Sequence, residues 1–183
     1  MNSPVPVAVI GTGHMGRHHV RIYHELPEAE LIGIVDADPA RAAALARDFK
    51  TQSFTSIEPL IGRVRAVSVA VPTVAHLEVA RPLLERNIAV LIEKPIAPDS
   101  ASARELLEVA RRHNALLQVG HTERFNPVVR AMKKMRVAPR FIETHRISPF
   151  TFRSADIGVV MDMMIHDIDI VLSLVRSKPV KVD

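Results

Sequence analysis

The feature that most constrains the fold is a cluster of glycines directly after an apolar segment. Val5–Ile10 is nearly continuous in apolar residues, which is typical of a strand buried on both faces of a parallel sheet. The segment His14–Leu26 that follows has the periodicity of an amphipathic helix. The turn between them matches G-x-G-x-x-G and comprises Gly11, Thr12, Gly13, His14, Met15 and Gly16. The order strand, glycine turn, helix predicts the first unit of a βαβ fold.

The same turn predicts a dinucleotide site. Gly11 permits the tight turn, Gly13 lets the backbone approach a pyrophosphate, and Gly16 allows close packing of helix on strand. The free N–H groups at the helix N-terminus then face the phosphates. The alternative, a glycine turn without a ligand, is the weaker interpretation because strand, glycines and helix are all in register.

Asp36 lies about 20 residues beyond the glycine turn, at the end of a predicted strand over Glu30–Val35. Its carboxylate can accept hydrogen bonds from ribose hydroxyls and would repel a 2′-phosphate. We therefore expect NAD as the cofactor. NADP is the less favoured alternative, which stays open because Arg41 could contact a phosphate.

Short apolar runs alternate with helical segments up to Gly120, which predicts βαβ units. The fold class is therefore α/β, a Rossmann-type doubly wound parallel sheet over residues 1–120. Asp38 and Pro39 form a favourable start for the second helix. Further strands are predicted at Ala66–Val71, Ile88–Glu93 and Ala115–Val119, and a helix at Val74–Arg86. A capping box at Ser102 and Glu105 predicts another helix, with a buried stripe of Ala103, Leu106, Leu107 and Ala110.

The pattern changes after Gly120, which predicts a second domain over residues 121–183. Arg140–Ile147 alternates like an antiparallel strand, and an apolar helix is expected over Ile157–Val175. Val180–Val182 resembles the start of another strand. One strand and one helix make a poor domain, so we expect the beginning of an α+β domain whose antiparallel sheet is truncated.

Composition excludes several classes of protein. The chain has no cysteine, which removes disulfides, thiolate metal sites and cysteine nucleophiles. The apolar runs are far shorter than a membrane span, and the N-terminus lacks the features of a signal peptide, so we expect a cytoplasmic protein with no membrane partner. A basic patch (Lys133, Lys134, Arg136) is read as a solvated helix face, and no nucleic-acid partner is expected. The only tyrosine is Tyr23, so the Tyr-x-x-x-Lys pair of short-chain dehydrogenases is absent.

Two segments that follow predicted strands are candidates for the site, because ligands bind beyond such strand ends. The first contains Pro72, Thr73 and His76, which we expect to contact the cofactor. The second is Glu93-Lys94-Pro95, where a lysine could stabilise a developing alkoxide and a cis Lys–Pro bond would fix its approach. An ordinary exposed lysine is the alternative.

A polar stripe marks the later helix. At about 100° per residue, Asp162, His166 and Asp169 fall within about 60° of one another, whereas Asp167 points away. Carboxylates and an imidazole on an otherwise apolar helix are costly unless they are paired, so they are candidates for proton transfer. A hydrogen-bonded structural network is one alternative. A metal site is a weaker one, and no metal is predicted.

Taken in order, these motifs resemble the glucose–fructose oxidoreductase/inositol dehydrogenase (Gfo/Idh/MocA) family. The resemblance includes the segment Gly120-His121-Thr122-Glu123-Arg124-Phe125-Asn126-Pro127 and covers essentially the whole chain. It implies a nicotinamide-dependent oxidoreductase that transfers a hydride between NAD(P) and a hydroxyl or keto carbon of a sugar, cyclitol or nucleotide sugar.

The resemblance also implies roles for individual residues. Lys94, Asp162 and His166 would be catalytic, with His166 taking the hydroxyl proton, Lys94 steadying the oxygen and Asp162 orienting His166. Glu93 and Lys94 would lie beside the nicotinamide ribose. Substrate contacts are expected from Arg124, Asn126, Arg153 and Asp169.

The segment from Arg146 to Ile170 resembles the branch of UDP-N-acetylglucosamine 3-dehydrogenases, and Arg146 and Arg153 would suit a diphosphate. A full-length member would be a homo-oligomer. The competing hypothesis is a non-catalytic dinucleotide-binding module or an inactive fragment of such an enzyme.

Overall fold

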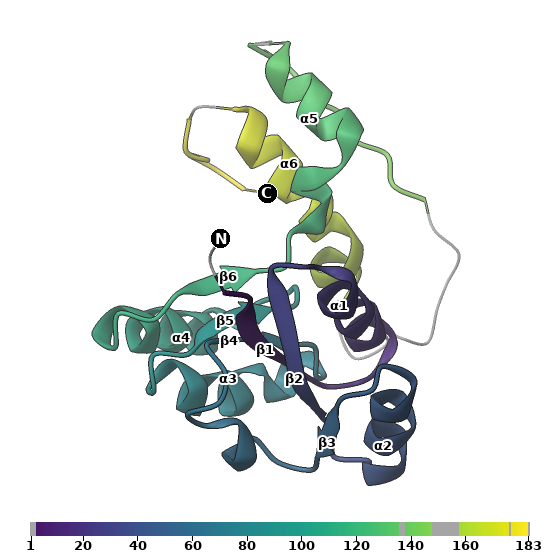
Figure 1. Cartoon of the computed structure of the whole chain (residues 1–183). Helices are drawn as coiled ribbons and strands as arrows, with labels where there is room; N and C mark the ends of the chain where they lie inside the picture. The colour runs from purple at the N-terminus through teal and green to yellow at the C-terminus, as the bar shows by residue number, and fades with distance from the viewer. Residues whose placement is uncertain (1–2, 136–137, 148–157, 176, 183) are drawn as a thin grey trace. The chain divides into compact units, whose positions relative to one another are not determined.

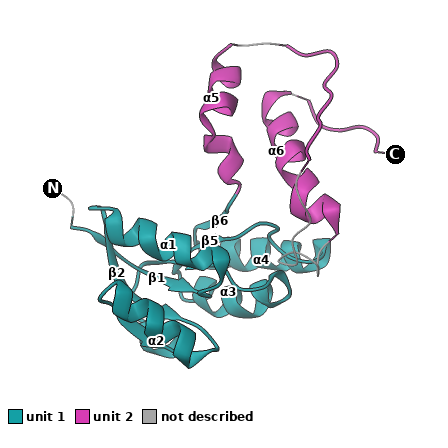
Figure 2. Cartoon of the chain, turned by 90° about the vertical axis from the view of Figure 1, so that its right-hand side faces the viewer, with its two compact units in different colours: residues 1–120 teal, residues 121–183 magenta. Residues whose placement is uncertain are grey.

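The computed structural model describes residues 3–135, 138–147, 158–175 and 177–182. The chain divides into two compact units, residues 1–120 and residues 121–183, which Figure 2 distinguishes by colour. Within the described ranges, no helix is both long and apolar enough to cross a membrane.

Unit 1 contains a six-stranded sheet in which every paired strand is parallel. Its strands are β1 (Val5–Ile10), β2 (Ala29–Val35), β3 (Gln52–Phe54), β4 (Ala66–Val69), β5 (Ala89–Ile92) and β6 (Leu117–Val119). The spatial order is β3-β2-β1-β4-β5-β6, so the order reverses between β1 and β4. The prediction of a doubly wound parallel sheet is confirmed, and the reversal is the switch point at which such sheets bind ligands.

Four helices cover the two faces of this sheet (Figure 1): α1 (His14–Glu25), α2 (Pro39–Asp48), α3 (His76–Leu84) and α4 (Ser100–Arg112). Neighbouring residues of β1 point to opposite faces, as the period of a strand requires. Val9 packs in one apolar cluster with residues of α1 and α2 such as Val20 and Leu45. Ala8 belongs to the other cluster, together with residues of α3 and α4. Burial on both faces explains why these strands are apolar almost throughout.

Aspartate side chains cap the N-termini of α2 and α4. The predicted cap of α2 is confirmed, because Asp38 Oδ1 accepts the N–H groups of Ala40 (3.0 Å) and Arg41 (3.1 Å). The predicted capping box of α4 is wrong. Asp99 is the N-cap, and its Oδ1 accepts the N–H groups of Ala101 and Ser102 at 2.8 Å. Glu105 pairs instead with Arg81 of α3.

Two further differences come from burial and from strand length. Leu106 is fully buried in α4, but its neighbour Leu107 is 44% exposed, so the predicted stripe is one residue too wide. The short edge strand β3 was not predicted, because Gln52-Ser53-Phe54 has no apolar run and pairs with β2 alone.

Within the described residues, the regular secondary structure of unit 2 is helical. It contains the 3-10 helix η3 (Thr122–Phe125), α5 (Pro127–Lys134), a π-helical turn η5 (Val160–Met164) and α6 (Ile165–Leu174). The predicted apolar helix is confirmed between Val160 and Leu174, while its expected start at Ile157 lies outside the described residues. The strands predicted at Arg140–Ile147 and Val180–Val182 are wrong: both segments are irregular, and neither has a β partner among the residues that the structure describes. Alternation alone does not make a strand without a neighbour to bond its backbone.

We predict that Leu106→Ala lowers the free energy of unfolding by about 2–5 kcal/mol, because it leaves a cavity in the core between α4 and the sheet. Leu107→Ala, one residue along the same helix, is the matched control and should cost under about 1 kcal/mol. Urea denaturation of both variants measures the difference. Equal losses would show that the register of α4 is wrong.

Candidate active site

A continuous ladder of backbone hydrogen bonds aligns the residues that follow the strands of unit 1. The residue directly after each of β1, β2, β4, β5 and β6 donates its backbone N–H to the carbonyl of the last residue of a neighbouring strand, at distances from 2.7 to 3.2 Å. The donors are Gly11, Asp36, Ala70, Glu93 and Gly120. Because the strands are parallel, all five lie at the carboxyl edge of the sheet. This edge carries the candidate site.

The glycine turn has two positions that admit no side chain. Gly11 has φ +89°, and a Cβ there would lie 2.6 Å from the Ala70 carbonyl oxygen. A Cβ at Gly16 would collide with the Gly11 carbonyl. Gly13 differs from both, since a Cβ there would meet no described atom within 4 Å. The backbone at Gly13 therefore borders open space, as contact with a phosphate group requires.

The N-terminus of α1 is chemically distinct from those of α2 and α4. No side chain of a described residue caps it, and its first turn, which includes His14, Met15 and Gly16, contains no acidic residue. By contrast, Asp38 and Asp99 cap α2 and α4. An uncapped helix start beside an open glycine turn leaves N–H groups for an anion. These residues fit the pyrophosphate of a dinucleotide.

Asp36 is 8% exposed and is fixed by three hydrogen bonds. Its Oδ2 accepts the Thr12 N–H (2.7 Å) and the Thr12 hydroxyl (2.5 Å), and its Oδ1 accepts the Asp38 N–H (2.9 Å). Burial alone would raise the pKa of the Asp36 carboxyl, but the hydrogen bonds from Thr12 and Asp38 and the charge of Arg41 outweigh it and hold that pKa below its usual value. An ionised carboxylate has about four acceptor sites, so one is left for a ribose hydroxyl.

The segment after β4 turns its histidine inward. Pro72 is exposed and Thr73 is buried at the start of the 3-10 turn η2 (Thr73–Ala75). The His76 ring is 1% exposed, with Nε2 3.1 Å from the Val71 carbonyl oxygen and Nδ1 3.0 Å from that of Pro95. Burial lowers the pKa of His76, against the opposing effect of these carbonyl groups. His76 therefore joins the segments after β4 and β5, and a direct contact with the cofactor stays a prediction.

The segment after β5 carries Glu93, Lys94 and a Lys94–Pro95 peptide bond that is cis, as predicted. Glu93 is 7% exposed, and its Oε1 lies 2.8 Å from Nε2 of His19 on α1. Burial raises the pKa of the Glu93 carboxyl, but the hydrogen bond and charge of His19 and the Lys94 N–H more than offset it, so the pKa is lowered. Lys94 is half-buried beside it.

In unit 2, Asp162 lies in the π turn and His166 in the first turn of α6, both half-buried. Asp169 is 6% exposed and forms a bidentate ion pair with Arg124, at 2.7 Å to Nε and 2.5 Å to Nη2. Burial raises the pKa of the Asp169 carboxyl, but the Arg124 guanidinium outweighs it and holds that pKa low. Both oxygens of Asp169 thus face a cation. No trio of His, Asp or Glu suited to a metal ion occurs among the described residues.

Of the other residues expected to contact a substrate, Asn126 and Arg146 are bonded to neighbouring residues of unit 2. Asn126 caps α5, since its Oδ1 accepts the Val128 N–H (3.0 Å) and its Nδ2 donates to Glu123 (3.1 Å). Arg146 forms a bidentate pair with Asp167, at 2.9 and 2.8 Å, on a different side of α6 from the Arg124 pair. Arg153 lies outside the described residues.

The structure therefore brings the predicted residues together in two groups. One group surrounds the glycine turn and Lys94 in unit 1. The other lies in unit 2, on η3, at the start of α5, and on η5 and α6. Proximity of Lys94 to Asp162 and His166 stays a prediction. Sequence reasoning missed the roles of Tyr23, Ser68 and His19, which form a row of hydrogen bonds that ends at Glu93. His19 lies within a helix and Ser68 within a strand, and neither is part of a recognisable sequence motif.

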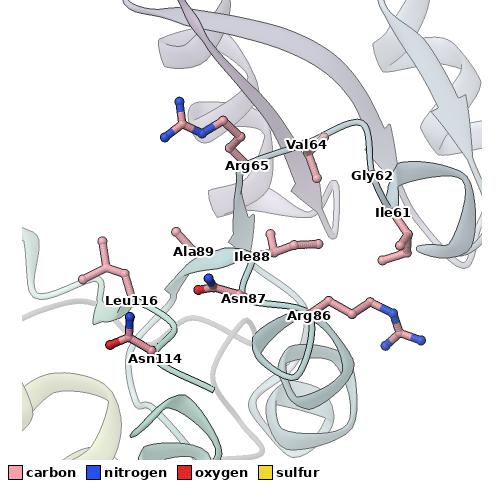
Figure 3. A pocket seen from close by; sticks show the side chains of 10 residues that line it. All are labelled: Ile61, Gly62, Val64, Arg65, Arg86, Asn87, Ile88, Ala89, Asn114 and Leu116. Carbon is pink, nitrogen blue, oxygen red and sulfur yellow. The ribbon is translucent and has the colours of Figure 1, made fainter. Parts of the chain in front are cut away.

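A hollow of about 620 Å³ lies at the opposite, amino edge of the sheet (Figure 3). Arg65, Asn87 and Asn114 line it near the segments that enter β4, β5 and β6. It contains none of the predicted site residues. The hollow is therefore separate from the carboxyl-edge site.

The parallel sheet with its switch point and glycine turn defines a dinucleotide-binding Rossmann domain. Residues 5–121 match the GFO_IDH_MocA family, described as an oxidoreductase family with an NAD-binding Rossmann fold. The chain belongs to this family, which confirms the resemblance inferred from the motifs and the expectation of NAD.

Individual relatives narrow the comparison. The chain is 38% identical over 175 residues to UDP-N-acetylglucosamine 3-dehydrogenase of Acidithiobacillus ferrooxidans, covering 95% of this chain and 55% of the relative. A solved structure of an enzyme of that name and organism superposes with a TM-score of 0.90 at 36% identity, covering 97% of this chain and 56% of the other. Inositol 2-dehydrogenase of Corynebacterium glutamicum is 32% identical, covering 100% and 58%.

A third solved structure, GenD2 from gentamicin A biosynthesis in complex with NAD, has a TM-score of 0.80 at 25% identity and covers 93% of this chain and 53% of its own. The chain spans a little more than half the length of these relatives.

We predict that Asp36 sets the choice between cofactors. The chain should bind NADH about tenfold or more tightly than NADPH, because a buried ionised carboxylate repels a 2′-phosphate. Asp36→Ser should reduce or reverse this ratio, since Arg41, 3.9 Å from Asp36, would then face the phosphate. Calorimetric titration measures both constants. The double variant with Arg41→Ala is the control and should lose the gain for NADPH; an unchanged ratio in Asp36→Ser would contradict the assignment.

Proposed function

We propose that this chain carries the cofactor site and the catalytic side chains of an NAD-dependent dehydrogenase that oxidises a hydroxyl group of a sugar, cyclitol or nucleotide sugar, or reduces the corresponding ketone. The observation that carries the proposal is the arrangement at the switch point. The open glycine turn after β1 and Lys94 after β5 lie at the same edge of the sheet, with β4 between them. Family membership supports it independently.

The chain's own groups fit the proton and charge changes of this reaction. Bound NAD supplies the acceptor for the hydride that leaves the substrate carbon. His166 takes the proton of the hydroxyl as the C=O bond forms, and Asp162 orients its ring. Lys94 stabilises the negative charge that develops on the oxygen. In the reverse direction His166 returns the proton to the oxygen.

Support for the substrate class comes from the relatives, which are named dehydrogenases of UDP-N-acetylglucosamine and of inositol. We favour a nucleotide sugar because the UDP-N-acetylglucosamine enzyme is the more similar of these two. Arg124 and Arg146 are already paired with Asp169 and Asp167, so a substrate diphosphate would have to compete with these carboxylates. Arg153, which lies outside the described residues, is the further arginine that we propose as a diphosphate contact.

We also propose that the full-length protein forms homo-oligomers and works in the cytoplasm. Val160, Met164, Ile168 and Leu172 are all more than a third exposed and recur along η5 and α6. Such a row of apolar side chains is typical of a surface that becomes covered. The absence of cysteine from the sequence fits a reducing compartment.

We predict NAD⁺-dependent turnover with UDP-N-acetylglucosamine in a panel that also contains myo-inositol and glucose, followed by the absorbance of NADH. Either His166→Asn or Lys94→Met should lower kcat by about 100-fold or more, because each removes a group that acts on the reacting oxygen. His145→Asn, an exposed histidine in the same unit, is the matched control and should keep the rate.

Two outcomes would contradict the proposal. Full turnover in His166→Asn would refute the proton-transfer role. Tight NADH binding with no turnover on any member of the panel would favour the non-catalytic module instead.

A further inference from the structure

A partly buried chain of hydrogen bonds runs from α1 to Glu93, directly after β5, and has no part in the reaction steps described above. The Tyr23 hydroxyl lies 2.8 Å from Ser68 Oγ, which lies 2.9 Å from His19 Nδ1. His19 Nε2 lies 2.8 Å from Glu93 Oε1. Ser68 is completely buried and Glu93 nearly so. The four groups join the helix that starts at the glycine turn to the residue that precedes Lys94.

The chemistry of the partners sets the direction of these bonds. Glu93 is ionised, because the pKa of its carboxyl is lowered, so it can only accept. His19 Nε2 must therefore carry a proton. When the ring holds a single proton, Nδ1 accepts from the Ser68 hydroxyl, and Ser68 in turn accepts from Tyr23. Every polar group in the row then has a partner, which is what burial requires.

Glu93 is held on more than one side. Its second oxygen accepts the backbone N–H of Lys94 at 3.2 Å. A Cβ at Gly120, the residue after β6, would lie 3.3 Å from the carboxylate, which is closer than an ordinary contact, so a glycine at this position lets Glu93 stay where it is. Glu93 itself donates its N–H to Val69 on β4. The carboxylate thus holds the backbone N–H of Lys94, and with it the Glu93–Lys94 peptide group.

We propose that His19 and Glu93 are a positioning pair that ties the phosphate-binding helix α1 to the Lys94 peptide and so sets the direction of the Lys94 side chain. The inference rests on the proposed function only for the catalytic role of Lys94. The contacts of Glu93 with His19 and with the Lys94 N–H do not depend on it. Neither residue touches the substrate. Glu93 acts through the Lys94 N–H, and His19 acts by holding Glu93 in place. A buried carboxylate deprived of its partner is costly, so loss of His19 releases Glu93 from its position.

The first test needs neither cofactor nor substrate. Exchange of the Lys94 amide hydrogen is followed by NMR in the 183-residue chain. His19→Ala and Glu93→Ala should each speed this exchange roughly tenfold or more, since each removes or releases the acceptor. His19→Gln, which keeps an N–H donor, should restore most of the protection. His24→Ala, an exposed histidine in the last turn of the same helix, is the matched control and should change nothing.

The amides of β4 serve as an internal reference. If they exchange faster to the same extent as Lys94, the variants have merely lost global stability. That result, or an unchanged Lys94 amide in both alanine variants, would overturn the proposal.

The second test separates positioning from binding. In His19→Ala, kcat with the best substrate of the panel should fall about tenfold or more, because Lys94 is misplaced, while the NADH dissociation constant changes little. His19→Gln should recover most of kcat. A fall in NADH affinity as large as the fall in kcat would show that the pair only supports cofactor binding. Titration of the unmodified chain with NADH tests the proposed function separately, so the two can fail independently.

Discussion

The site depends on the register of one parallel sheet. Backbone hydrogen bonds between adjacent strand ends place Gly11, Asp36, Ala70, Glu93 and Gly120 along a single edge, although more than a hundred residues separate the first from the last. Because every strand runs in the same direction, each adds its next residue to this edge. A slip of one residue in any pairing would turn a buried side chain to the opposite face and displace the group that follows it. The positions of the candidate site residues of unit 1 therefore depend on the register of the sheet.

Close packing carries that register into the glycine turn. Gly11 and Gly16 have no room for a side chain because the backbone at Ala70 and the Gly11 carbonyl occupy that space. The close contact at these two glycines places the start of α1 directly beside the switch point. The N-terminus of α1 has no side-chain cap. The hydrogen bonds of His19 and Tyr23 then attach the same helix to β4 and β5. One helix thus connects the expected phosphate site with the Lys94 peptide.

Prediction from the sequence succeeded where the physical signal is local and strong. Apolar runs located β1, β2, β4 and β5, and the Asp38–Pro39 pair located the start of α2. It failed where a partner decides the structure, as for the polar edge strand β3 and for the unpaired segment Arg140–Ile147. In the site, the motifs identified Glu93 and His76 as important. They could not show that both side chains turn inward, because that depends on His19 and on the Val71 and Pro95 carbonyl groups.

The most direct measurement is the mapping of NAD⁺ binding by backbone amide chemical shifts in the 183-residue chain. Binding at the switch point should give the largest changes at Thr12, Gly13 and Gly16, with further changes at Asp36 and Lys94. Changes centred instead on Asn87 and Asn114, which line the hollow at the amino edge, would contradict this placement, as would a folded chain whose amides do not respond to the dinucleotide.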